Sequence, residues 1–143
     1  MAEPDVTLVE QTLRINAAPE TVWRFWTEPE GMCAWWGTAA ELDPRPGGIY
    51  RVEMEGGPVM AGRYVELVPH ERIVFTFGWE PTEGAPDVPP ESTRVEVTLA
   101  PDADDTILTL RHLGLPEQYT SEHDEGWSHF LARLQHATGT RLA

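Results

Sequence analysis

The chain has 143 residues, 24 of them acidic and 10 basic, which gives a net charge of -14 at pH 7. A field of this sign repels nucleic acid and anionic membrane surfaces, so we expect neither as a partner. The hydrophobic share of 41% and the six tryptophans exclude a disordered chain, and the length suits a single domain over residues 1–143.

The cysteine content and the N-terminal residues bear on the compartment. Cys33 is the only cysteine, which excludes an internal disulfide and fits a reducing environment. Residues 1–9 show neither the basic nor the apolar region of a secretory signal, and no run approaches the ~20 apolar residues of a membrane span. We therefore expect a cytoplasmic protein.

The chain opens with a predicted strand followed by two short helices. Residues 6–15 alternate between apolar and polar positions, which predicts a half-buried strand. Pro19 stands where a first helical residue belongs, and Glu20 lies in the turn that favours negative charge, so a short helix should follow. Pro29 ends this helix or separates it from a second helical stretch that reaches residues 35–37.

The middle of the chain shows the signals of strands and turns, with no helical period. The predicted strands cover residues 39–42, 49–55, 59–68, 73–79, 94–99 and 106–112. The inward face of the third stays open, because Met60 and Tyr64 on one side compete with Val65 on the other. A bulge near Gly62 would reconcile them. Residues 80–92 carry four prolines, too many for a strand, and predict a long loop.

The last periodic segment predicts a long helix. Ser121, with Asp124 three residues later, provides a cap for its start. Its apolar residues recur at i, i+3, i+4 and i+7, and they are Trp127, Phe130, Leu131 and Leu134. One face of this helix is therefore apolar, and we expect the sheet to cover it.

Six short phrases, spread over nearly the whole chain, occur in a distinctive order. They are AAPETVW at 17–23, WW at 35–36, PGG at 46–48, RIVFTF at 72–77, the strand at 106–112, and HDEGW at 123–127 followed by Phe130, Leu131 and Leu134. In order and spacing they resemble the START-like, helix-grip superfamily, and within it the branch related to the activator of the ninety-kilodalton heat-shock protein ATPase.

The resemblance implies an α+β fold in which a curved antiparallel sheet of six to seven strands surrounds a long C-terminal helix, with two short helices after strand one. It is a poor guide to function, because this superfamily holds lipid carriers, hormone receptors, cyclases and co-chaperones. Activators of that chaperone carry a further N-terminal domain with no counterpart in these residues, so ATPase activation is not carried over.

One end of the sheet is the expected place for a ligand. In an antiparallel meander the turn at Gly56, the loop 80–92 and the link 114–120 share one end. The resemblance implies that the short helices bring Trp35 and Trp36 to the same rim, and a gap between sheet and helix there suits a small molecule. The candidate ligand-binding residues are Trp35, Met54, Tyr64, Phe75, Phe77, Trp79, Leu110, His112, His123, Trp127 and Phe130.

A simpler interpretation is that these side chains only fill a core, as aromatic residues commonly do. His112 and His123 lie on otherwise apolar faces, which suits either a structural histidine or one that orients a polar ligand group. We predict no metal site and no cofactor, because His129 and His136 lie about two helical turns apart and Cys33 has no partner at ligand spacing.

Three functions remain open at this point. We favour the binding of a small hydrophobic or aromatic molecule in an internal cavity between the sheet and the C-terminal helix. The second is a partner-binding, co-chaperone-like or regulatory domain. The third is an enzyme of the cyclase or hydrolase type, for which His112, His123 and Tyr64 are the candidates for proton transfer and no catalytic residue is assigned. We expect a monomer or a homodimer.

Overall fold

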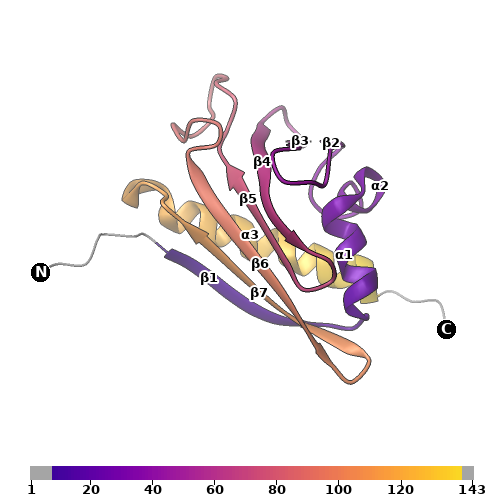
Figure 1. The fold of residues 1–143 in the computed structure, drawn as a ribbon. Helices are drawn as coiled ribbons and strands as arrows, with labels where there is room; N and C mark the ends of the chain where they lie inside the picture. Colours follow the sequence, from indigo (N-terminus) through magenta and orange to yellow (C-terminus); the bar gives the residue numbers. More distant parts are fainter. Residues whose placement is uncertain (1–7, 140–143) are drawn as a thin grey trace, which may run out of the picture.

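A computed structural model describes residues 8–139, and in it one long helix runs across a curved antiparallel sheet (Figure 1). The strands are β1 (Leu8–Ile15), β2 (Ala39–Leu42), β3 (Ile49–Glu53), β4 (Val59–Val68), β5 (Arg72–Phe77), β6 (Thr93–Asp102) and β7 (Asp105–Leu113). The helices are α1 (Pro19–Thr27), α2 (Pro29–Met32) and α3 (Glu117–Gly139). The fold is α+β and of the helix-grip kind, which confirms the predicted class.

The sheet has seven strands in the order β1-β7-β6-β5-β4-β3-β2, so all but the first pair follow the chain as a meander. Alternation sets the inward faces, because Val95, Val97 and Leu110 are fully buried while Arg94 on the other face is exposed. The first predicted strand is confirmed from Leu8 onward, and its residues 6–7 lie outside the described residues.

The inward face of β4 is settled by a bulge. Tyr64 is buried and the next residue, Val65, is 40% exposed. The pairing with β5 shifts between Tyr64 and Glu66, so the predicted bulge exists but lies at Val65. Glycine is required at position 62 for another reason. A Cβ atom there would lie 1.8 Å from the carbonyl oxygen of Thr76, and only glycine permits so close an approach of β4 and β5.

Helix α3 begins at Glu117, four residues before the predicted start, so the capping role given to Ser121 is wrong. Ser121 is an exposed residue inside the helix. The carbonyl of Pro116 accepts hydrogen bonds from the Tyr119 N–H at 2.9 Å and the Thr120 hydroxyl at 3.3 Å, which closes the first turn. Proline is tolerated just before the helix because its missing N–H would have had no helical partner.

The core lies between the sheet and α3, and it is rich in aromatic rings. Tyr50 and Phe75 stack with their ring centroids 4.1 Å apart, and Trp26 meets Trp35 at 4.8 Å. The helix contributes Leu131 and other buried side chains to the same cluster, as its spacing predicted. None of the helices described within residues 8–139 combines the length and the hydrophobicity of a membrane span.

Candidate ligand-binding pocket

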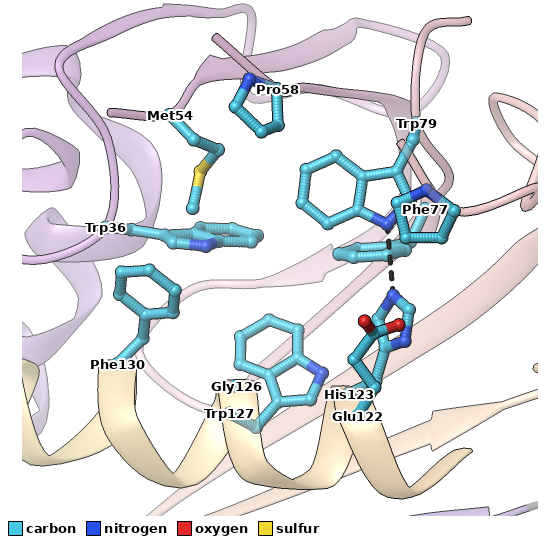
Figure 2. A pocket seen from close by; sticks show the side chains of 11 residues that line it. Trp36, Met54, Pro58, Phe77, Trp79, Glu122, His123, Gly126, Trp127 and Phe130 are labelled. Atoms are coloured by element: carbon cyan, nitrogen blue, oxygen red, sulfur yellow. Dashed lines mark hydrogen bonds between the residues drawn. The ribbon is translucent and has the colours of Figure 1, made fainter. Parts of the chain in front are cut away.

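A pocket of about 210 Å³ lies between α3 and the end of the sheet that carries the β3–β4 turn and the β5–β6 loop (Figure 2). We call it the α3 pocket. Six of the candidate ligand-binding residues line it, namely Met54, Phe77, Trp79, His123, Trp127 and Phe130. Five lining residues were not among the candidates, namely Trp36, Pro58, Pro86, Glu122 and Gly126. The two loops and the helix expected to share one end of the sheet therefore do meet around this space.

Helical spacing places the α3 side of the wall. Glu122, Gly126 and Phe130 follow one another at four-residue intervals and form one stripe along the helix. His123 and Trp127, also four apart, form a second stripe beside it. Figure 2 shows the side chains of these residues rising from α3 toward the opposite wall, except at Gly126, which has none. This four-residue period is visible in the sequence. Extending it from Phe130 toward the N-terminus identifies Gly126 and Glu122, the two lining residues of α3 that were not among the candidates.

The other five candidates lie in the core instead of on the pocket wall. They are Trp35, Tyr64, Phe75, Leu110 and His112, and each is almost fully buried. The indole N–H of Trp35 donates to the Phe25 carbonyl at 2.9 Å, and the ring stacks on Trp36 with centroids 5.4 Å apart. Strand alternation identifies inward side chains but not which of them border an unfilled space, so it does not separate these five from the residues that line the pocket.

His112 is hydrogen-bonded in the core to Trp127 and Thr93, and these bonds assign the tautomer of its ring. Trp127 Nε1 donates to His112 Nδ1 at 3.0 Å, so the proton of the neutral ring is on Nε2. Nε2 then donates to Thr93 Oγ1 at 2.8 Å, and that hydroxyl donates to the Phe77 carbonyl at 2.8 Å. Burial, with a smaller effect from His123, lowers the pKa of His112 to about 3, so the ring is neutral at pH 7.

His123 forms a second tryptophan–histidine pair, on the pocket wall. Trp79 Nε1 donates to His123 Nε2 at 3.0 Å, the bond dashed in Figure 2, and His123 Nδ1 donates to the Tyr119 carbonyl at 2.8 Å. Burial lowers the pKa of His123, opposed by the Tyr119 bond and the charge of Glu122. All four ring nitrogens of His112 and His123 thus have protein partners, which favours structural roles for both.

Tyr64, the third candidate for proton transfer, has a similar environment. Its hydroxyl donates to the Trp26 carbonyl at 3.0 Å, and burial raises its pKa, with the charge of Asp43 adding to the shift. A phenol held in this way does not exchange protons near neutral pH. Among residues 8–139, no group of three or more His, Cys, Asp or Glu side chains is placed to hold a metal ion.

Gly126 leaves part of the pocket open. A Cβ atom at this position would meet nothing within 4 Å, so no neighbour demands glycine here. We expect Gly126→Ala to raise the free energy of unfolding by about 0.5 to 1 kcal/mol, because glycine is costly inside a helix. Urea unfolding measures the change. Gly62→Ala is the contrasting control and should destabilise; a loss of stability in Gly126→Ala would contradict an open space at this position.

The fold is that of the START-like superfamily, and the sequence gives the family within it. The profile of the family described as Activator of Hsp90 ATPase homolog 1-like protein matches residues 16–139. The chain belongs to this family, which confirms the resemblance drawn from its motifs. A search of curated proteins found no match.

Solved structures resemble the chain over most of its length. An AHSA1-like protein from Rhizobium etli is 38% identical with a TM-score of 0.73, and the match covers 97% of this chain and 86% of that one. A protein from Mesorhizobium loti is 20% identical with a TM-score of 0.81, and the match covers 95% of this chain and 99% of that one. At this identity it shows the fold alone. DynU16, described as a putative protein in the dynemicin biosynthetic locus, is 25% identical with a TM-score of 0.77, covering 92% of this chain and 46% of that one.

Proposed function

We propose that the protein binds a small hydrophobic or aromatic molecule in the α3 pocket. The observation that carries the proposal is the lining, which consists largely of five aromatic rings, one methionine and two prolines around about 210 Å³. An apolar cavity of about 150 Å³ already suffices for benzene, so a molecule of one or two rings fits here. Burying such a molecule removes apolar surface from water on both sides, which supplies the driving force.

The polar groups of the wall support a binding role over a catalytic one. His123 has both ring nitrogens bonded to the protein, and Glu122 is exposed at the pocket's edge. Proton transfer by either histidine would first require a hydrogen bond to Trp79 or Trp127 to break. The position of DynU16 in a biosynthetic locus fits a small organic ligand as well.

A protein-docking role has less support. Within the described residues, the large hydrophobic side chains that are exposed are Leu8 and Val65. They lie on β1 and β4, which three other strands separate in the sheet, so they do not make one apolar patch.

Calorimetric titration with naphthylmethanol, a neutral two-ring probe, tests the proposal. We expect saturable binding with one site per chain. Gly126→Leu should weaken binding at least about tenfold, because the new side chain extends into the open space beside the Gly126 backbone. Ser128→Leu places the same side chain on an exposed position of the same helix and should leave binding unchanged.

Two results of this titration would contradict the proposal. An absence of saturable binding would remove the binding function. Binding of equal strength in the parent and in Gly126→Leu would place the probe outside the α3 pocket.

A further inference from the structure

Resting on the proposed function, we infer that the α3 pocket selects an aromatic molecule that carries a positively charged end, and that Glu122 receives that end. Three features of the molecule favour such a ligand: the charge that lines the pocket, the aromatic rings beside it and the electrostatic field of the whole chain.

Glu122 is the one charged residue among the eleven that line the pocket. It is exposed, so its carboxylate is accessible from the pocket's edge. His123 beside it adds no positive charge, since its Nε2 accepts from Trp79 and the ring is neutral. A cationic group at this end therefore meets a carboxylate, while an anionic group meets repulsion.

One arginine of α3, Arg133, lies beside the α3 pocket without lining it. Arg133 borders an adjoining hollow, which Glu55 borders too, and which shares with the α3 pocket the residues Trp36, Met54, Pro58, Trp79 and Phe130. The Arg133 Nε donates to the Trp35 carbonyl at 2.9 Å, and Arg133 follows Glu122 along α3 by about three helical turns. Its charge thus lies toward the opposite end of the helix stripe from Glu122.

Aromatic faces line the space next to Glu122. The indole N–H of Trp79 is engaged with His123, so what Trp79 offers a ligand is its ring. The faces of aromatic rings carry partial negative charge and attract cations, most strongly in tryptophan. In Figure 2, Trp79, His123 and Glu122 gather at one end of the pocket, and Met54, Trp36 and Phe130 at the other. A ligand with a cationic head and an apolar ring matches these two ends.

The field of the whole chain acts in the same direction. A net charge of -14 attracts cations and repels carboxylates over distances of about a Debye length. This long-range part falls with salt, whereas contact with Glu122 and the aromatic rings is screened less. The salt dependence of binding therefore separates the two contributions.

Three probes of nearly equal shape test the inference by calorimetry at low salt and at about 0.5 M salt. They are naphthylmethylamine, a cation at neutral pH, the neutral naphthylmethanol and the anion naphthoate. We expect the amine to bind about three- to tenfold more tightly than the alcohol, as expected for one cation contact, and the carboxylate to bind most weakly. The preference for the amine over the alcohol should persist at high salt.

Two variants with the same change in net charge locate the effect. Glu122→Gln should lower the affinity for the amine about three- to tenfold and abolish the preference for the amine over the alcohol. Glu125→Gln removes an exposed charge of the same helix that does not line the pocket, and it should leave both unchanged at high salt.

The outcomes distinguish this inference from the proposed function. If the alcohol binds and the amine binds no better, the pocket binds apolar molecules without preference for cations, and only the inference fails. Equal losses in Glu122→Gln and Glu125→Gln would assign the preference to the overall field and overturn the role of Glu122. If none of the three probes binds, both fail.

Discussion

Replacing Trp127 by alanine is expected to lower the free energy of unfolding by about 3 to 5 kcal/mol. The side chain is 4% exposed, and its ring lies 5.1 Å from that of Trp36 between centroids. The change removes this packing between α3 and the segment after α2. It also leaves His112 Nδ1 without its donor inside the core, which adds the cost of an unsatisfied buried acceptor. Urea unfolding followed by circular dichroism gives the value.

Trp23→Ala is the matched control for this change. Trp23 is only partly buried on α1, where its ring meets His70 edge to face, so its loss should cost less than half as much. Trp127→Phe keeps a large ring but not the N–H, and it should cost about 1 to 3 kcal/mol. A Trp127→Ala protein as stable as the parent would show that α3 does not pack on the sheet through this residue.

Acidification is expected to weaken the fold through His112. The pKa of this group is lowered from the usual 6.5 to about 3 by burial, so below about pH 6.5 the unfolded chain binds a proton that the folded chain does not. Its contribution to stability is therefore complete above about pH 6.5. It falls by about 1.4 kcal/mol per pH unit as the pH drops from about 6.5 toward 3.

His112→Phe isolates this contribution, because it keeps a ring in the core and removes the titrating group. Between about pH 6.5 and 5 most carboxylates stay ionised, so the histidines dominate the change. We expect the parent to lose about 1.5 kcal/mol more than the variant over this range, whatever the absolute stability of the variant. His123, whose pKa burial also lowers, contributes to both proteins alike. Parallel pH profiles would contradict a neutral, buried His112.

The strands and the stripe of α3 were predictable because they depend on short periods. Val95 and Val97 face inward by alternation, and Leu131 and Leu134 follow the helical period, and all four are buried. The start of α3 was not predictable from Ser121, because a plausible capping residue also occurs inside helices. Pro116 and the bonds to its carbonyl decide the start.

The pocket was harder to predict than the fold, as two neighbouring tryptophans illustrate. Trp35 and Trp36 follow α2 in a turn that has no period. Of the two, Trp35 was predicted to be a ligand-binding residue. Both rings are buried in the structure. Trp35 packs against Trp26, whereas Trp36 borders the open space of the pocket. Which of two adjacent rings borders an open space depends on how the whole core packs, and a local pattern does not contain that information. The ligand-binding role of the lining residues stays a prediction.

The indole N–H signals of the six tryptophans give the most direct test of the proposed pocket. Trp36, Trp79 and Trp127 line the pocket, whereas Trp23, Trp26 and Trp35 do not. In a two-dimensional nitrogen–proton NMR spectrum, titration with naphthylmethanol should give its largest saturable shifts in the three signals of the first group. Shifts confined to the second group, or no saturable shift in any of the six, would contradict a ligand in the α3 pocket.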